Sequence, residues 1–382
     1  MKEAPVPMAR NRTLKQSGVK KSGALGRLVT IVVTVGLTLG VLEALVRTMD
    51  GVAFAPRSFV ADKLSLFASA YPSVYDPLLG YVPKPKFSGT ANAWNTEVTI
   101  DRLSLRQNAA DTPTPDPVAV LAVGDSYTFG DEVSDSETWP AQLDGLLGQP
   151  VANAGVFGYG LDQAVLRAER LVPELEPWAL VVSFIYGDVR RTQLIQRTGV
   201  EKPYFDVVDG ALVLRNVPPS RNRPRIEQMG VVRAALGYSY LVDWTARRLG
   251  ATEWWYAGGF PQVKVHDDGP TVACLLMRRL KALEEKTGSK VLVVAQYLSR
   301  NITDLVSPKS VEELTGSERL LACAQQAGLA TLDTLSSLRA LYDADPAGFY
   351  SKYFLVAHMS KAGNRVVAEG VADALVELLG GE

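Results

Sequence analysis

Residues Val118 to Gly130 read VAVLAVGDSYTFG, and this stretch decides the fold. The run from Val118 to Val123 is short and wholly apolar, which is typical of a β-strand buried on both faces. It ends in Gly124-Asp125-Ser126, which places a hydroxyl at the carboxyl edge of the sheet, where open α/β folds bind ligands. The pattern therefore predicts Ser126 as a candidate nucleophile. A plain strand-to-helix turn capped by Ser126 is the alternative.

Strand-like and helix-like segments alternate from residue 116 onwards. The expected strands are 118–123, 151–153, 180–185, 291–295 and 330–333, and the expected helices are 136–147, 163–172, 272–285, 318–326 and 362–379. This alternation predicts an α/β fold with a parallel sheet covered by helices on both faces.

Residues 189–262 interrupt the alternation. Asp209-Gly210 indicates a hairpin turn in this stretch, and Trp254-Trp255-Tyr256 follows later. A tryptophan pair can stack on a sugar ring or simply pack in a core. We interpret the stretch as an insertion at the carboxyl edge of the sheet, near the site. A packed decoration of the body is the alternative.

The N-terminal part of the chain indicates a membrane anchor. Residues 1–27 carry a net charge of +6, which leaves −7 for the other 355 residues. Residues 28–46 follow as an apolar run with one charged side chain, Glu43. As a helix this run spans about 28 Å, close to the thickness of a hydrocarbon core. The positive-inside rule then predicts a cytoplasmic tail, with a lead-in (47–115) and the domain 116–382 outside. A signal peptide cleaved near residues 53–55 is the alternative.

Composition excludes some classes of function. The acidic body gives no electrostatic case for nucleic-acid binding. Because His266 and His358 are the only histidines and no cysteine cluster exists, a histidine-rich metal site is excluded, and we expect no metal or cofactor. Any histidine base must be one of these two. Cys274 and Cys323 lie in apolar helical patterns, and we expect buried free thiols rather than a disulfide between neighbouring helices.

Two further segments carry candidate site residues. Residues Asn153 to Gly160 read NAGVFGYG, and such glycines let backbone amides approach a ligand as an anion pocket. His358 precedes the last expected helix, on a loop that would reach over the sheet edge towards Ser126. Each segment alone also fits a plain loop.

Together these segments resemble the SGNH, or GDSL, hydrolase family over about residues 118–379. Ser126 matches the nucleophile of the family, Gly158 its oxyanion glycine and His358 its base. The resemblance implies a three-layer α/β/α, flavodoxin-like SGNH hydrolase fold. Residues 81–85 of the lead-in and 137–140 after the nucleophile look like the membrane-anchored bacterial members.

Two positions depart from the family pattern. Gly187 stands where an Asn side chain usually completes the oxyanion hole, and Leu355 stands where an Asp-x-x-His pattern has its acid. Loss of one oxyanion donor costs about 10²- to 10³-fold in rate. Loss of the acid that orients the histidine costs about 10⁴-fold. If nothing replaces these groups, Gly187→Asn and Leu355→Asp should accelerate the reaction. Three replacements for the missing acid are open: a backbone carbonyl that holds His358, Asp188, or an acidic residue of the insertion. The candidate supporting residues are Asp125, Asn153, Gly187 and Asp188.

The resemblance implies a membrane-anchored serine esterase or O-acyltransferase of the bacterial cytoplasmic membrane, with its catalytic domain in the periplasm. Ser126 would carry the acyl group, and the amides of Ser126 and Gly158 would bind the oxyanion. The expected substrate is an O-acylated, in particular O-acetylated, cell-surface or exported polysaccharide. Two alternatives remain open: a catalytically impaired domain that binds glycan or supports assembly, and a lipase- or lysophospholipase-like esterase.

Overall fold

The computed structural model describes residues 22–49, 73–91, 96–109, 115–197, 200–220, 231–237, 239–251, 255 and 262–380. The chain forms two compact units, residues 1–54 and 55–382. In the first unit, α1 spans Ser22–Met49. Among the described residues, it is the one helix long and apolar enough to cross a membrane. Within this helix Arg47 Nε donates to the Glu43 carboxylate at 2.9 Å, so the charge inside the predicted span is paired.

Five parallel strands form the central sheet of the second unit. They are β5 (Val120–Val123), β6 (Val151–Asn153), β7 (Ala179–Phe184), β13 (Lys290–Ala295) and β14 (Ala330–Asp333). Their order across the sheet is β14-β13-β7-β5-β6, and each neighbouring pair is parallel. Counted along the chain this is the flavodoxin-like order 2-1-3-4-5. The predicted fold class is thus confirmed, and the order reverses between β5 and β7, where such folds bind ligands.

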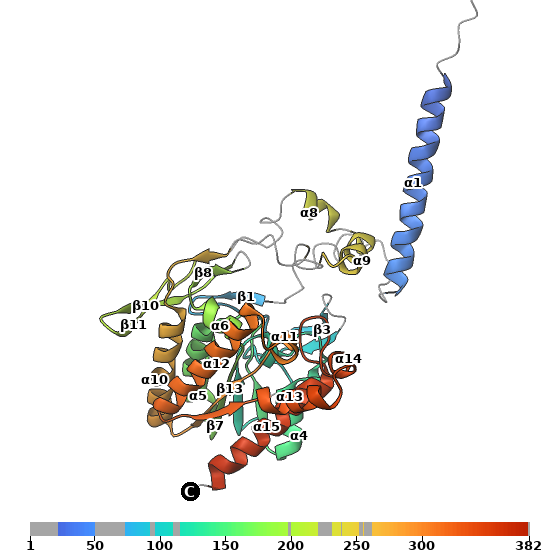
Figure 1. The fold of residues 1–382 in the computed structure, drawn as a ribbon. Helices are drawn as coiled ribbons and strands as arrows, with labels where there is room; N and C mark the ends of the chain where they lie inside the picture. Colours follow the sequence, from blue (N-terminus) through green and yellow to red (C-terminus); the bar gives the residue numbers. More distant parts are fainter. Residues whose placement is uncertain are drawn as a thin grey trace, which may run out of the picture. The chain divides into compact units, whose positions relative to one another are not determined.

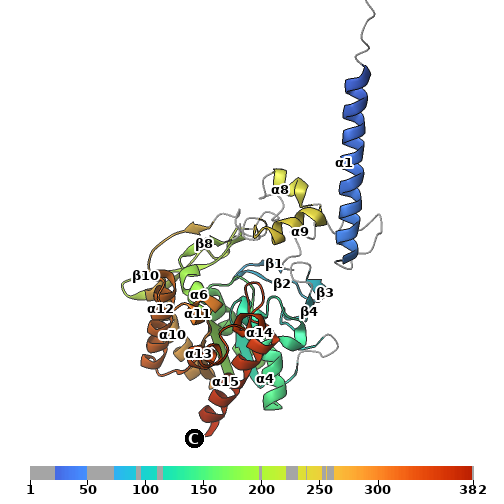
Figure 2. The ribbon, with the colours of Figure 1, turned by 45° about the vertical axis from the view of Figure 1, so that its right-hand side comes forward.

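Helices cover both faces of this sheet. They are α4 (Trp139–Leu147), α5 (Leu161–Leu175), α10 (Gly269–Thr287), α12 (Pro308–Gln326) and α15 (Lys361–Gly380). Helices α4 and α15 lie side by side, and α5, α10 and α12 form another contiguous layer (Figures 1 and 2). Right-handed crossovers place these two groups on opposite faces for this strand order. The residues of β5 and β7 are therefore buried, as their apolar sequences predict.

Shorter elements complete the second unit. The lead-in forms two antiparallel hairpins, β1 (Ser73–Asp76) with β2 (Gly80–Pro83) and β3 (Ser88–Ala91) with β4 (Thr96–Thr99). The others are α3 (Ser126–Phe129), η1 (Asp135–Glu137), α6 (Tyr186–Arg191), β8 (Leu194–Arg197), β9 (Val200–Glu201), β10 (Tyr204–Val208), β11 (Ala211–Arg215), α8 (Val231–Leu236), α9 (Tyr240–Arg248), β12 (Val263–Lys264), α11 (Ser299–Thr303), α13 (Leu335–Ala344) and α14 (Phe349–Tyr353).

The stretch 189–262 contains the predicted hairpin. Strands β10 and β11 pair antiparallel, and Asp209 and Gly210 both have positive φ between them. Trp255 is fully buried and its Nε1 donates to Asp243 at 2.7 Å, so this tryptophan packs within the protein. Trp254 and Tyr256 lie outside the described residues.

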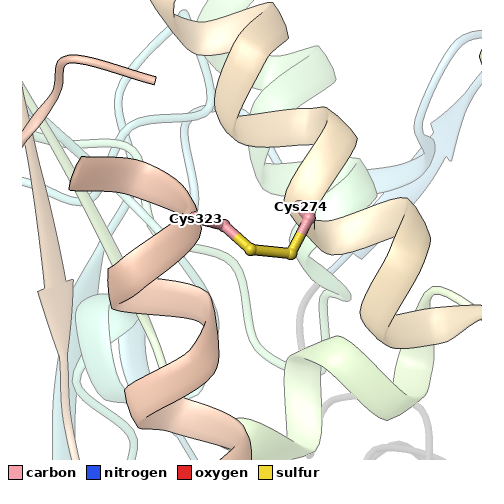
Figure 3. The surroundings of a disulfide bond; sticks show 2 residues. All are labelled: Cys274 and Cys323. Atoms are coloured by element: carbon pink, nitrogen blue, oxygen red, sulfur yellow. A yellow bond between two sulfur atoms is a disulfide. The ribbon is translucent and has the colours of Figure 1, made fainter. Parts of the chain in front are cut away.

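Cys274 of α10 and Cys323 of α12 form a disulfide (Figure 3), so the expectation of two free thiols is wrong. The two helices pack directly against each other, which brings the two Cα atoms to 5.3 Å, within the range that a disulfide spans. Sequence periodicity shows which face of each helix is apolar. It does not show which residues of two separate helices meet, and this is why the bridge was missed.

Candidate active site

Ser126 lies where β5 ends, at the carboxyl edge next to β7. The preceding turn is tight, because a Cβ on Gly124 would lie 2.3 Å from Thr128 Oγ1 and 2.6 Å from the Ser183 carbonyl oxygen. Asp125 caps α3 by accepting from the Tyr127 amide at 2.9 Å. Its other oxygen, Oδ2, accepts from Ser126 Oγ at 3.3 Å. Glycine and aspartate therefore fix the position of the hydroxyl at the switch point of the sheet.

His358 reaches Ser126 from the loop between α14 and α15. Its Nε2 lies 2.9 Å from Ser126 Oγ. The loop is held by an amide hydrogen bond from Leu355 to the His358 carbonyl at 2.8 Å, and by the hydroxyl of Tyr127, which donates to the Ala357 carbonyl at 3.1 Å. The structure thus brings the predicted nucleophile and the predicted base together.

Glu132 supplies the carboxylate that the sequence lacks at Leu355. Its Oε1 lies 3.1 Å from His358 Nδ1, and the amide of Ala357 donates to both carboxylate oxygens at 3.0 and 3.1 Å. None of the three alternatives (a backbone carbonyl, Asp188 or an acidic residue of the insertion) takes this place, because the group at His358 Nδ1 is Glu132. The loop after α3 turns back over the site with Glu132 at φ 71°. The Asp131-Glu132 pair so close to Ser126 was an available signal.

Arg106 from the lead-in holds this loop in place. Its buried guanidinium donates to the carbonyls of Phe129, Gly130 and Val133 at 2.8, 2.6 and 2.7 Å, and to Asp135 at 3.0 Å. These acceptors flank Glu132 on both sides. Sequence reasoning left Arg106 out, because nothing in the local pattern couples the lead-in to the residues after the nucleophile.

The charges around His358 favour its protonated form. Burial lowers the pKa of His358, but its contact with Glu132 and the charges of Asp131 and Glu132 outweigh burial, and the pKa lies above the ordinary value. Burial also raises the pKa of Glu132, yet its contact with His358 brings that pKa below the ordinary value. Asp131 lies 3.9 Å from His358 Nε2, and burial raises the pKa of Asp131 to about 7. Glu132 thus stabilises an imidazolium at His358, and Asp131 adds to this effect when it is ionised.

Gly158 lies on the loop after β6, at φ 78°. A Cβ there would lie 2.5 Å from Arg197 Nη1 and 3.0 Å from the Tyr81 hydroxyl. Tyr81 donates to the carbonyl of Phe157 at 2.7 Å, and Arg197 donates to the carbonyl of Gly158 at 2.5 Å. The carbonyls of Phe157 and Gly158 therefore point towards Tyr81 of the lead-in and Arg197 of β8. Ser126, as the first residue of α3, has an amide without an intrahelical acceptor.

Asn153 braces the loops around the site. Its Nδ2 donates to the Phe129 carbonyl at 3.3 Å, and its Oδ1 accepts from the Gly155 amide at 3.0 Å. The side chain is fully buried, with an exposed fraction of 0%. Both ends of the Asn153 side-chain amide therefore bond to backbone groups of the protein.

Gly187 and Asp188 belong to α6, directly after β7. Asp188 accepts from the amide of Ile185 at 3.0 Å and from Arg191 at 2.5 Å. Burial and then the charge of Asp125 raise the pKa of Asp188 well above its ordinary value. Gly187 has a helical backbone outside the left-handed region.

Within the described ranges, no group of three His, Cys, Asp or Glu side chains is arranged to hold a metal ion.

His266 lies apart from these residues. Its Nδ1 accepts from the amide of Asp268 at 3.2 Å, and its ring lies 6.0 Å from that of Tyr204. The two histidines of the chain therefore occupy different surroundings, and the one on the loop before α15 contacts Ser126.

No known protein-family model and no curated protein matches this chain. Similar solved structures include LAE5, an α/β hydrolase enzyme from the metagenome of Lake Arreo, Spain, with TM-score 0.41 and 12% identity, over 67% of this chain and 94% of that one. Two structures of Axe2 from Geobacillus stearothermophilus, described as an acetyl xylan esterase and an acetyl-xylooligosaccharide esterase, each have TM-score 0.39. They are 12% and 14% identical and cover 68% of this chain and 94% of theirs. These similarities assign no activity to this chain.

Proposed function

We propose that this chain is an SGNH-type serine esterase or O-acyltransferase with the catalytic triad Ser126, His358 and Glu132. The observation that carries the proposal is the continuous line of contacts from Ser126 Oγ to His358 Nε2 at 2.9 Å and from His358 Nδ1 to Glu132 at 3.1 Å. Acyl transfer through a serine requires a nucleophile that contacts a base, and a base that contacts an orienting acid. These three side chains are arranged in that order. The Glu132 contact also weighs against a catalytically impaired domain.

In the proposed reaction, neutral His358 donates a hydrogen bond from its Nδ1–H to Glu132. The Ser126 hydroxyl turns its proton from Asp125 Oδ2 to His358 Nε2. Ser126 Oγ attacks the ester carbonyl carbon while its proton moves to Nε2. The amides of Ser126 and Gly158 bind the resulting oxyanion. Collapse breaks the bond to the leaving alcohol, which takes the proton from Nε2 and leaves an acyl group on Ser126. Water or an acceptor hydroxyl then gives its proton to Nε2 and attacks the acyl carbonyl carbon, and the bond to Ser126 Oγ breaks as Oγ takes that proton back.

Kinetics of the full chain in detergent with p-nitrophenyl acetate test this proposal. Ser126→Ala and His358→Ala should each lower kcat/KM by at least about 10³-fold. His266→Ala serves as the matched control and should keep most of the activity. An unchanged rate in Ser126→Ala would remove the proposal. Addition of an alcohol acceptor distinguishes an esterase from an O-acyltransferase. A transferase forms the new ester faster than it releases free acetate, whereas an esterase releases mainly acetate.

We further propose an O-acetylated surface or exported polysaccharide as the substrate. An anchored domain outside the cytoplasmic membrane would meet such polymers, and the long apolar helix α1 after a basic tail supports that location. Acetate release from an O-acetylated polysaccharide should exceed fatty-acid release from a lysophospholipid. The reverse preference would favour the lipase-like alternative.

The proposed location is the bacterial cytoplasmic membrane, with the body in the periplasm. Protease added to intact spheroplasts should digest the body and spare the N-terminal tail. Protection of the body would contradict this orientation. A mature chain that begins near residue 56 would instead indicate cleavage of a signal peptide.

A further inference from the structure

Arg191 lies at the point where the family pattern lacks its asparagine. A Cβ on Gly187 would lie 3.6 Å from Arg191 Nη2, in ordinary van der Waals contact. Because Gly187 has a helical backbone, no left-handed conformation demands glycine there. The space that the side chain of residue 187 would enter is therefore next to the guanidinium of Arg191.

Three acceptors hold the second terminal nitrogen of this guanidinium, Nη1, in place. Arg191 Nη1 donates to Asp188 Oδ1 at 2.5 Å, to the Tyr159 carbonyl at 2.9 Å and to Asp125 Oδ2 at 3.1 Å. The same Asp125 oxygen accepts from Ser126 Oγ. Tyr159 follows Gly158, the glycine proposed for the oxyanion. One nitrogen of Arg191 thus connects the segments that carry Ser126, Gly158 and Gly187.

Arg191 Nη2 remains available. Within the part of the chain that the structure describes, this nitrogen makes no hydrogen bond, and it does not belong to the buried side-chain atoms that lack a partner, so it is accessible. The side chain is 15% exposed. Although burial lowers the pKa of Arg191, the charges of Asp188 and Asp125 raise it above the ordinary value, so the guanidinium stays charged. A fixed cation with a free NH₂ group therefore lies beside position 187, where the family pattern has its asparagine.

We infer that Arg191 is a catalytic residue that replaces the missing asparagine and donates from Nη2 to the oxyanion of the tetrahedral intermediate. This inference rests on the proposed serine esterase function. A preorganised charged donor stabilises the negative charge that develops in the transition state more than the ground-state carbonyl, so its loss falls on kcat. It also explains why the site tolerates glycine at position 187.

Arg191→Met in the full chain in detergent tests the inference with p-nitrophenyl acetate. We expect kcat to fall by about 10²- to 10³-fold with KM changed less than about threefold. Arg190→Met is the matched control on the same helix, because Arg190 pairs with Glu313 instead, and its kcat should stay within about threefold. In the Arg191→Met background, Gly187→Asn should restore kcat at least about tenfold, whereas Gly187→Asn alone should give no gain.

A kcat of Arg191→Met within about fivefold of wild type would overturn the inference, as would a loss that Gly187→Asn does not restore. Loss of Arg191 leaves Asp188 and Asp125 unneutralised. If that variant fails to fold, Asp188→Asn/Arg191→Met keeps the charge balanced and is judged by the same criteria. Labelling of Ser126 by a fluorophosphonate separates the two claims. Wild type that neither labels nor hydrolyses ends the proposed function and this inference with it, whereas active wild type with fully active Arg191→Met ends only the inference.

Discussion

The carboxylate of Glu132 contacts Nδ1 of His358 at 3.1 Å, although the two residues stand 226 positions apart in the sequence. Ser126 begins the single turn of α3 and Glu132 follows shortly after that turn, and His358 contacts both. The segment after β5 thus supplies both ends of the proposed triad, and the loop before α15 supplies its middle. The SGNH pattern instead expects the acid on the same loop as the histidine.

Glu132→Gln should lower kcat by about 10³- to 10⁴-fold, because the amide no longer stabilises the imidazolium and also fits the wrong tautomer of His358. Steady-state kinetics with an aryl acetate measure this effect. Glu369→Gln, on the exposed part of α15, is the control. Leu355→Asp should give no acceleration, since Nδ1 already has its carboxylate. A Glu132→Gln variant within about fivefold of wild type would show that Glu132 has no such role.

The sequence predicted much of the fold, because buried parallel strands and their covering helices are local patterns. The strand before Ser126 and the helices after it were found in this way, and so was the turn at Asp209-Gly210. The sheet edge also explains why Ser126 and His358 could be placed together from the family resemblance.

Contacts that depend on the paths of loops could not be predicted. Glu132 reaches His358 because the loop after α3 turns back and Arg106 holds its carbonyls. Arg191 is the last residue of α6, and its side chain contacts Asp125 and the Tyr159 carbonyl. Helical spacing alone gives no reason to single it out. Both are side chains whose role depends on a partner far away in the chain.

Asp131→Asn should shift the acidic limb of the pH–rate profile to lower pH. The reaction needs neutral His358, so the rate rises with pH through the pKa of His358 in the folded protein. The charge of Asp131 helps to raise that pKa, and its removal therefore lowers it. Profiles of kcat/KM between about pH 5 and 9 measure the shift. A limb that stays in place or moves to higher pH would contradict the assigned electrostatics.

Gly158→Ala should lower kcat/KM by about 10²-fold, because the added Cβ meets Arg197 and Tyr81 and displaces the amide from the oxyanion position. Gly210→Ala is a matched control. Gly210 also has positive φ, at 77°, but it has open space around it and lies in a hairpin away from Ser126. Both variants carry backbone strain, so equal losses of activity in the two would argue against a role of Gly158 in the site.

Cys274→Ala/Cys323→Ala should reduce the free energy of unfolding by about 2–4 kcal/mol, since the bridge closes a loop between residues 49 positions apart. Urea denaturation measures this loss. The hydrolysis rate of the folded protein should change less than about twofold, because α10 and α12 carry none of the proposed triad. Free-thiol titration of the unreduced, denatured wild type should find no thiol, and two thiols would contradict the bridge.

The most direct test of the proposed triad is the site and rate of covalent labelling by a fluorophosphonate, mapped by mass spectrometry of the full chain in detergent. We expect one adduct per chain, on Ser126, formed much more slowly in His358→Ala and Glu132→Gln. We also expect no adduct in Ser126→Ala. A folded wild type that takes up no label, or takes it up at another residue while Ser126 stays unmodified, would contradict the account.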